Sequence, residues 1–237
     1  MGRTGPHTGP SMGNLSTMAD QIDAARLRAW LSEYARLIDE NATRLTELDA
    51  AIGDADHGSN MQRGMAAVQR ALDDVPDGAT ADTVLKTAAM TLISSVGGAS
   101  GPLYGTLFLR MSTAAGAAEG LDGPEFAAAL RAGVNGLAAR GKAQSGDKTM
   151  YDALGPACDA LENALGAGDD LGGALADAAR AAETGRDAVT PLVARKGRAS
   201  YLGQRSVGHQ DPGATSAALL ITAAATALGG MAPTAND

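Results

Sequence analysis

The amino-acid sequence predicts an all-α protein, built as a single-domain barrel or bundle of eight antiparallel helices. Aromatic residues make up only 3% of the 237 residues. β-branched residues are sparse while Ala, Leu and Met are plentiful, a composition that favours helices over strands. Apolar side chains recur at helical spacing in eight windows, which glycine and proline separate. Because most connections are short, we expect neighbouring helices to run antiparallel.

The first expected helix spans residues 20–41, where apolar residues form one stripe at helical spacing. Trp30 and Tyr34 lie four residues apart on this stripe, and we expect both to anchor the core. A later helix should begin near Asp122 or Gly123, because Pro124 suits a first helical turn. After the first, the windows cover about residues 59–73, 80–96, 103–119, 124–139, 148–165, 170–187 and 213–229.

The last window lies in a segment, residues 212–236, that carries no charged side chain. Hydroxyl side chains interrupt this segment and alanine dominates the rest, so insertion into a membrane would be poor. We therefore expect a buried core helix and no membrane span. The many alanines and glycines of the other helices predict close packing, with small residues where helices meet.

Bulk properties exclude several classes of protein. The formal net charge of −8 argues against a nucleic-acid partner, which needs a basic face. Cys158 is the only cysteine, so no internal disulfide forms, and we expect a buried apolar role for it. Residues 1–17 lack the apolar core of a secretory signal and are expected to form a flexible tail before one domain at residues 18–237. We expect the protein to be cytoplasmic.

The most informative segment is residues 48–60, in which Asp49, Asp54 and Asp56 fall close together. Three neighbouring carboxylates repel one another unless a cation sits among them. Their oxygens suit Mg²⁺ or Ca²⁺, and Mg²⁺ commonly completes its shell with phosphate oxygens. The flanking Gly53 and Gly58 would allow backbone N–H groups to turn toward an anion. The segment thus predicts a metal–phosphate site in the first interhelical turn.

Two known motifs come close to this segment and fail. Residues 53–58 have the glycine spacing of a phosphate loop, but Ser59 and Asn60 stand where Lys and Ser or Thr are required. An EF-hand starting at Asp54 would need Gly at Ser59 and Glu at Met65. An alternative interpretation remains open, in which the segment is a solvated acidic turn whose aspartates cap the next helix.

Three more interhelical segments carry glycine with hydroxyl or charged residues. Residues 97–105 could form an anion cradle at a helix start, or a plain turn capped by Ser100. Residues 141–150 hold two lysines that could meet phosphate, although a solvated loop is the commoner explanation. Residues 195–213 lack helical periodicity and are long for a compact domain, which indicates a functional loop. Arg198 or Arg205 there could stabilise a transferring phosphoryl group.

Taken together, four motifs resemble the nucleotide-binding L subunit of dihydroxyacetone kinase over roughly residues 20–230. In chain order they read Gly-Asp-Ala-Asp-His-Gly after Leu-Asp, Gly-Gly-Ala-Ser-Gly-Pro-Leu-Tyr-Gly, Gly-Asp-Lys-Thr-Met, and Gly-Arg-Ala-Ser-Tyr-Leu-Gly followed by Asp-Pro-Gly-Ala. The resemblance implies an eight-helix barrel that holds ADP or ATP at one end with two Mg²⁺ ions.

The resemblance also implies a role for particular residues. The metal ligands would be Asp49, Asp54 and Asp56. The phosphates would be lined by His57, Gly58, Ser59 and Asn60, and contacted by Ala99 and Ser100. The adenosine end would be enclosed by Gly141, Met150, Asp211, Pro212 and Gly213. Arg198 would face the phosphoryl group as the catalytic residue.

Partners follow from the same resemblance. In this family the ketone is held on a separate K subunit, and a phosphohistidine-bearing M subunit of the phosphotransferase system can recharge the bound ADP. The sequence shows no K-like domain, so we expect a separate K subunit and an M subunit that recharges the bound ADP. The alternatives are an ATP-dependent subunit acting on dihydroxyacetone or another short ketose, and a non-catalytic ADP-bound partner of a transcription regulator. Whether the chain forms a homodimer stays open.

Overall fold

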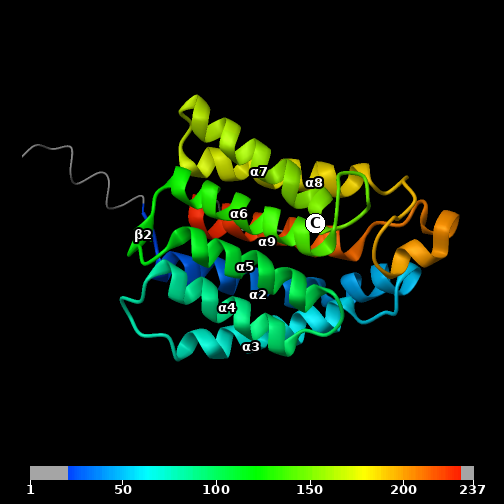
Figure 1. Ribbon diagram of the computed structural model, residues 1–237, viewed down its shortest axis with the longest axis horizontal. Helices are drawn as coiled ribbons and strands as arrows, with labels where there is room; N and C mark the ends of the chain where they lie inside the picture. The colour runs from blue at the N-terminus through cyan, green and yellow to red at the C-terminus, as the bar shows by residue number, and fades with distance from the viewer. Residues whose placement is uncertain (1–20, 231–237) are drawn as a thin grey trace, which may run out of the picture.

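The computed structural model describes residues 21–230, so the expected tail at residues 1–17 lies outside the described residues. Within them the chain forms eight α-helices, one 3₁₀ helix and two short strands (Figure 1), which confirms the all-α fold class. In chain order they are β1 (Ile22–Asp23), α2 (Ala24–Ile52), α3 (His57–Asp73), α4 (Ala81–Ser95), α5 (Ser100–Ala115), β2 (Gly120–Leu121), α6 (Gly123–Gly141), α7 (Met150–Ala167), α8 (Leu171–Ala188), η2 (Arg198–Ser206) and α9 (Pro212–Gly229).

The helices form a closed ring. Each packs against its neighbours in sequence, and α9 packs against α2. Consecutive helices run antiparallel, so every second connection lies at the same end of the molecule (Figure 1). The connections after α2, α4, α6 and α8 share one end. These are the four polar segments that the sequence singles out, and the topology therefore gathers them at one place.

The first helix is longer than expected and starts later. Asp23 caps α2 by accepting a hydrogen bond from the Arg26 backbone N–H at 2.8 Å. The helix then runs to Ile52, since no glycine or proline interrupts it before Gly53. Asp49 consequently lies in the last turn of α2. The expectation that all three aspartates come from the interhelical turn is wrong for this one.

The long segment at residues 195–213 contains a helix that the sequence pattern did not predict. Residues 198–206 form η2, which Gly203 interrupts with a φ of 55°. The two strands were also unpredicted. They pair only Ile22 with Leu121 and Asp23 with Gly120, antiparallel, and tie the start of α2 to the start of α6.

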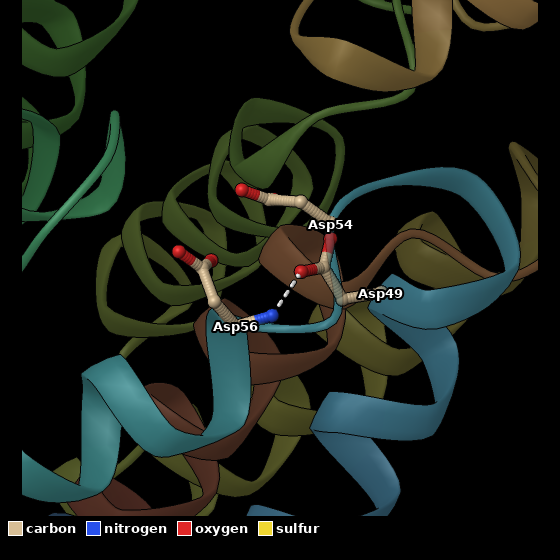
Figure 2. Close-up of side chains that lie close together, drawn as sticks. All are labelled: Asp49, Asp54 and Asp56. Atoms are coloured by element: carbon tan, nitrogen blue, oxygen red, sulfur yellow. Dashed lines mark hydrogen bonds between the residues drawn. The ribbon is translucent and has the colours of Figure 1, made fainter.

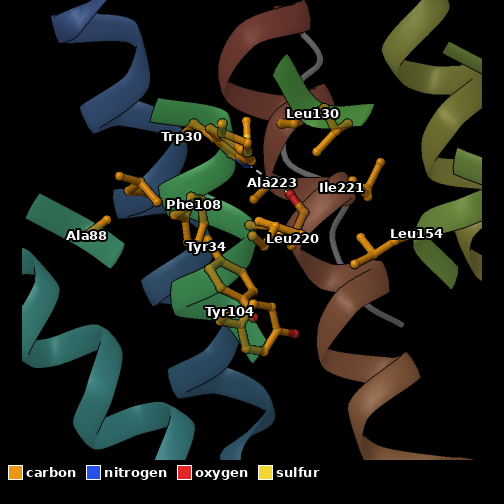
Figure 3. Close-up of a cluster of buried hydrophobic side chains, with 14 of the residues drawn as sticks. Trp30, Tyr34, Ala88, Tyr104, Phe108, Leu130, Leu154, Leu220, Ile221 and Ala223 are labelled. Atoms are coloured by element: carbon orange, nitrogen blue, oxygen red, sulfur yellow. Dashed lines mark hydrogen bonds between the residues drawn. The ribbon is translucent and has the colours of Figure 1, made fainter. Parts of the chain in front are cut away.

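The core is apolar and contains both expected anchors (Figure 3). Trp30 and Tyr34 are fully buried. The Trp30 ring packs edge-on against Phe108 and Phe126, with ring centroids 5.8 and 5.4 Å away. Its indole N–H donates to the Leu220 carbonyl oxygen on α9 at 2.9 Å. Cys158 is also buried as expected, and burial raises the pKa of its thiol to about 12.

Helix α9 is long and apolar enough to cross a membrane by length and composition, but 67% of it is buried inside the described structure. It packs against α2, α7 and α8, as expected for a core helix. Small residues allow such close approaches between helices. A Cβ atom on Gly58 of α3 would lie 2.0 Å from the Ala42 carbonyl oxygen, and one on Gly185 of α8 would lie 2.0 Å from that of Asp152.

Candidate functional site

A cavity of about 380 Å³ lies where the four polar segments meet, within the size range of small-molecule sites. The residues singled out from the sequence that line it are Asp49, Asp54, Asp56, His57, Asn60, Ala99, Ser100, Gly141, Met150, Arg198, Asp211, Pro212 and Gly213. Gly58 and Ser59 do not line it. Gly58 packs against α2, and the Ser59 hydroxyl donates to the Asp56 carbonyl oxygen at 3.0 Å.

Three aspartates that line the cavity lie close together and form an acidic cluster (Figure 2). Asp49 comes from the last turn of α2, Asp54 from the turn, and Asp56 from the residue that precedes α3. One carboxylate oxygen from each lies within 4.8 Å of the others. Ala55, between Asp54 and Asp56, adopts a φ of 62° in the left-handed region, so the backbone turns between these two aspartates. This set of hard oxygen donors fits a divalent cation such as Mg²⁺.

Asp49 also organises the turn itself. Its Oδ2 accepts hydrogen bonds from the backbone N–H groups of Asp56 at 2.8 Å and His57 at 3.1 Å. Asp56, at the N-cap position of α3, makes no such bond with its own side chain. The alternative interpretation, in which aspartates cap the next helix, therefore holds for Asp49 and not for Asp56. Gly53 is required beside it, because a Cβ there would lie 2.0 Å from Asp49 Oδ1.

A guanidinium group borders the acidic cluster. Arg198, the first residue of η2, donates from Nη2 to Asp54 Oδ2 at 2.9 Å. The Arg198 side chain is 67% exposed and that of Asp54 33%, so this ion pair contributes little to stability. Arg205 does not line the cavity. Of the two arginines that the sequence offered, the structure brings Arg198 to the aspartates.

His57 joins three helices beneath the cluster. Its Nδ1 lies 3.1 Å from the Ser100 hydroxyl of α5, and its Nε2 lies 2.9 Å from the Ser216 hydroxyl of α9. Tyr104 completes the chain with its hydroxyl 2.8 Å from that of Ser216. Burial lowers the pKa of His57, against the opposing effect of Asp49 and Asp56. The ring is therefore neutral near pH 7 and acts as a hydrogen-bonding bridge.

The glycine-rich segment before α5 faces the same cavity. Gly98 has a φ of 65°, and α5 begins at Ser100 with no side chain capping its first turn. The Ser100 hydroxyl bonds to His57, so the alternative in which Ser100 caps its own helix is wrong. The uncapped first turn leaves backbone N–H groups and the positive end of the helix dipole available to an anion.

Apolar side chains and the start of α9 also line the cavity. Met150 opens α7 and lies beside Gly213, where a Cβ would be 3.2 Å from the Met150 side chain. Leu103 and Leu137 also line the cavity. Asp211 caps α9, accepting from the Ala214 backbone N–H at 2.7 Å. Burial raises the pKa of Asp211 to about 7, against the lowering effect of that hydrogen bond.

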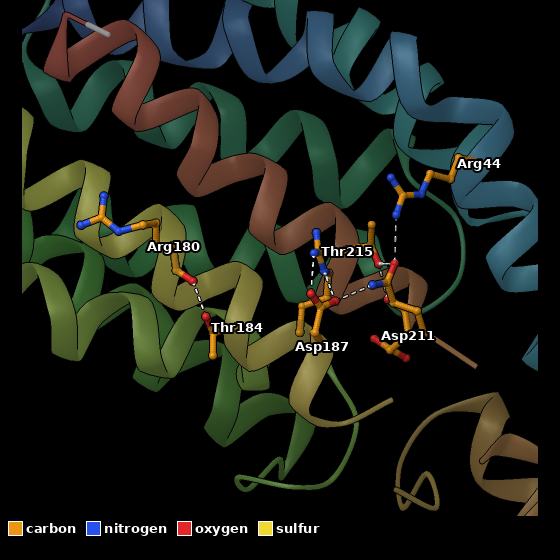
Figure 4. Close-up of polar contacts among 8 residues, drawn as sticks. Arg44, Arg180, Thr184, Asp187, Asp211 and Thr215 are labelled. Atoms are coloured by element: carbon orange, nitrogen blue, oxygen red, sulfur yellow. Dashed lines mark hydrogen bonds and ion pairs between the residues drawn. The ribbon is translucent and has the colours of Figure 1, made fainter. Parts of the chain in front are cut away.

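A polar network that the sequence did not reveal supports the turn at Asp211 (Figure 4). Gln210 donates to Asp187 of α8 at 2.7 Å and accepts from Thr215 of α9 at 3.2 Å and from Arg44 of α2 at 3.4 Å. Arg186 holds Asp187 with two hydrogen bonds of 2.8 and 2.9 Å and lowers the pKa of that carboxyl. The network joins three helices immediately before the residues that line the cavity.

Two further residues were missed or misread at the sequence level. Ser216 gave no signal, because a hydroxyl in an alanine-rich helix is ordinary. Lys148 was expected to meet phosphate or to lie in a solvated loop; it lines the cavity, but only 1% of it is exposed, so the solvated-loop interpretation is wrong. Its ammonium group contacts main-chain carbonyl oxygens. Lys148 has a positive φ of 64°. Its carbonyl partners come from residues 190–206, so the sequence around Lys148 does not disclose them.

Fold and cavity together define an all-helical protein with an acidic cluster, a glycine-rich helix start and an arginine around one cavity. The chain matches the DAK2 domain over residues 51–226. It is 45% identical over 194 residues to the ADP-binding subunit DhaL of PEP-dependent dihydroxyacetone kinase 1 from Listeria innocua, covering 82% of this chain and 91% of that one. It is also 45% identical over 187 residues to the corresponding DhaL subunit from Escherichia coli, covering 79% and 89%.

The chain therefore belongs to the DAK2 domain family. Its fold is similar to that of the dihydroxyacetone kinase from C. freundii, solved in complex with AMP-PNP and Mg²⁺, with a TM-score of 0.65 and 23% identity. The match covers 95% of this chain and 38% of that kinase chain. At this identity the similarity shows the fold alone.

Proposed function

We propose that this chain is the nucleotide-binding subunit of a dihydroxyacetone kinase, in which bound ADP or ATP passes a phosphoryl group to dihydroxyacetone held on a separate K subunit. One observation carries the proposal. The acidic cluster, the uncapped start of α5 and Arg198 line a single cavity, in a chain whose relatives are ADP-binding subunits.

The metal fits the residues present. Asp49, Asp54 and Asp56 offer carboxylate oxygens within 4.8 Å of one another, which is a donor set suited to Mg²⁺ bound together with phosphates. We infer two such ions. When bound, they would neutralise the charge of the phosphates and align donor with acceptor. Arg198 contacts Asp54, so its guanidinium would lie beside the transferring phosphoryl group and stabilise charge there.

The remaining residues divide between the phosphates and the nucleoside. His57, Asn60, Ala99 and Ser100 line the cavity together with the aspartates, and phosphate oxygens would meet the start of α5 there. Gly58 and Ser59 would act through the backbone by setting where α3 begins. The adenosine would be enclosed by the residues that the sequence prediction gives for it, all of which line the cavity: Gly141, Met150, Asp211, Pro212 and Gly213.

The phosphoryl donor follows from the relatives. Both DhaL subunits belong to PEP-dependent kinases, so we propose that a phosphohistidine-bearing M subunit rephosphorylates ADP that stays bound to this chain. The K subunit would supply the ketone. ADP is then a resident cofactor and not an exchanging substrate.

Reconstitution tests this function. The chain purified with ADP and Mg²⁺ is expected to form dihydroxyacetone phosphate only when a K subunit and a phosphorylated M subunit are both added. The variant Asp54→Asn should lose ADP during desalting, because one metal-binding carboxylate is gone. Fast turnover of ATP and dihydroxyacetone by the chain alone would contradict the proposal, and so would ADP retention that is independent of Mg²⁺.

A further inference from the structure

Lys148 is a buried cation whose partners are all main-chain carbonyl oxygens. Its Nζ lies 3.0 Å from the carbonyl oxygen of Thr190, 3.2 Å from that of Leu192 and 2.6 Å from that of Ser206. An ammonium group has three N–H donors, so all are used. An ion this deeply buried persists only if hydrogen bonds replace its lost water. These three carbonyl oxygens thus use the whole hydrogen-bonding capacity of the Lys148 ammonium group.

The three carbonyls belong to both ends of one segment. Thr190 and Leu192 follow α8, and Ser206 is the last residue of η2. Lys148 immediately precedes Thr149, the N-cap of α7. One side chain therefore fixes the beginning and the end of residues 190–206 to the rigid start of α7. Arg198 lies between the two anchored ends.

Little else holds this segment. Apart from Val189, the buried apolar residues of the stretch are Ala194 and Ala199, which form a small cluster with Ile52, separate from the main core. Tyr201 is 89% exposed. A segment with few buried apolar contacts opens easily unless polar contacts hold it. Apart from bonds between residues no more than three positions apart, the polar contacts of the segment are those of Lys148 and four others. The Arg195 N–H donates to the Asp147 carbonyl oxygen at 3.0 Å, the Gly208 N–H to that of Thr190 at 3.0 Å and the Ala194 N–H to the Ser206 hydroxyl at 2.9 Å, and Arg198 pairs with Asp54 at 2.9 Å.

We propose that Lys148 is a positioning residue for Arg198: by holding residues 190–206 against the start of α7, it keeps the guanidinium at the acidic cluster. Lys148 lines the cavity, but its three N–H donors are all used by main-chain carbonyl oxygens, so it does not touch the reacting atoms in this role. The inference rests on the proposed phosphoryl transfer for its catalytic consequence, but the anchoring itself can be measured without any activity. It predicts that loss of the ammonium group affects transfer more than nucleotide binding.

Lys142 offers a matched control in the same connection. It also has a positive φ, 49°, but its side chain is exposed and does not line the cavity. The variants Lys148→Met and Lys142→Met therefore remove the same charge from the same type of backbone conformation. Only the first removes a donor from three buried or partly buried carbonyl oxygens.

Hydrogen exchange of the free chain tests the anchor. In Lys148→Met, the amides of Ala194, Arg195 and Gly208 should exchange at least about tenfold faster, while amides of α2 and α9 keep their protection. Lys142→Met should match the wild type. Unchanged protection of residues 190–208 in Lys148→Met would overturn the proposal. Should that variant fail to fold, Lys148→Gln, which retains two N–H donors, is measured in the same way.

Phosphoryl transfer in the reconstituted system tests the link to Arg198. Lys148→Met should lower the transfer rate at least about tenfold and change the Kd for Mg–ADP less than about threefold. In an Arg198→Ala background, the same substitution should cause no further loss, because both changes remove one interaction. Additive losses would refute positioning through Arg198. A wild-type chain without transfer would instead refute the proposed function, and the exchange data would still decide whether Lys148 is the anchor.

Discussion

Arg198 and Asp54 form an ion pair of 2.9 Å that links η2 to the turn between α2 and α3. The two residues are far apart in sequence, and a different structural feature positions the segment that carries each of them. Ala55 turns the aspartate loop through a positive φ, and Lys148 anchors the segment that carries Arg198. The pair shows that the cationic and the acidic part of the cavity meet directly. The consequences can be tested residue by residue.

The first prediction concerns the role of Arg198 in transfer. Arg198→Ala should lower the rate of phosphoryl transfer roughly 10²-fold or more, because a guanidinium beside the transferring group stabilises charge that develops in the transition state. Affinity for Mg–ADP should change little. Rates in the reconstituted system and calorimetric Kd values separate the two effects. Arg205→Ala, on the same 3₁₀ helix but outside the cavity, is the control and should behave as the wild type.

The second prediction separates two aspartates of the cluster. Asp49→Ala should lower the free energy of unfolding by about 1–3 kcal/mol even without metal, since two backbone N–H groups at the start of α3 lose their acceptor. Asp54→Ala should stay within about 0.5 kcal/mol of the wild type, because Asp54 makes only a partly exposed ion pair. Urea unfolding in EDTA measures both. Equal stabilities of the two variants would show that Asp49 has no structural role.

Much of the fold followed from the sequence because helical periodicity and glycine punctuation are local signals. The start of α6 was found from Pro124, which suits a first helical turn. The extension of α2 to Ile52 was missed because the polar stretch that contains Asp49 resembled a turn more than a helix end. The segment 195–213 was correctly set apart, but its order depends on Lys148, a residue from another connection.

At the site, too, local motifs could be predicted from the sequence and contacts between distant segments could not. The aspartates and the glycine-rich turn could be proposed from spacing, since each is a compact motif. His57 was singled out, but its partners Ser100 and Ser216 come from α5 and α9, and no local pattern connects them. Contacts between distant segments depend on how the ring closes. They become visible only in three dimensions.

The third prediction tests a close approach of helices next to the site. Gly58→Ala should lower the free energy of unfolding by about 1–3 kcal/mol, because its Cβ would lie 2.0 Å from the Ala42 carbonyl oxygen and 2.4 Å from the Thr46 hydroxyl. Gly166→Ala is the matched control. Gly166 lies within α7 with no atom within 4 Å of an added Cβ, so it should leave stability unchanged or raise it by up to about 1 kcal/mol. Thermal or urea unfolding without nucleotide provides the comparison.

The last prediction concerns pH and Asp211. Burial raises the pKa of Asp211 from 3.8 to about 7 in the folded chain. Between those values the folded state binds more protons than the unfolded state, so the contribution of Asp211 to stability decreases as pH rises. It is fully present below about pH 4 and lost once the pH passes about 7. His57 acts in the opposite direction, since its pKa is lowered by burial.

The variant Asp211→Asn isolates this contribution, because asparagine keeps an oxygen that can cap α9 but cannot ionise. The difference in unfolding free energy between Asp211→Asn and the wild type should shift in favour of the variant as the pH rises from 4 to 7, and stay constant above that. Urea unfolding at several pH values, without nucleotide or metal, measures it. Asp122→Asn is the control, because Asp122 caps α6 in the same way from a more exposed position. A difference for Asp211→Asn that does not vary with pH would mean that its carboxyl titrates in the folded chain as it does in the unfolded one.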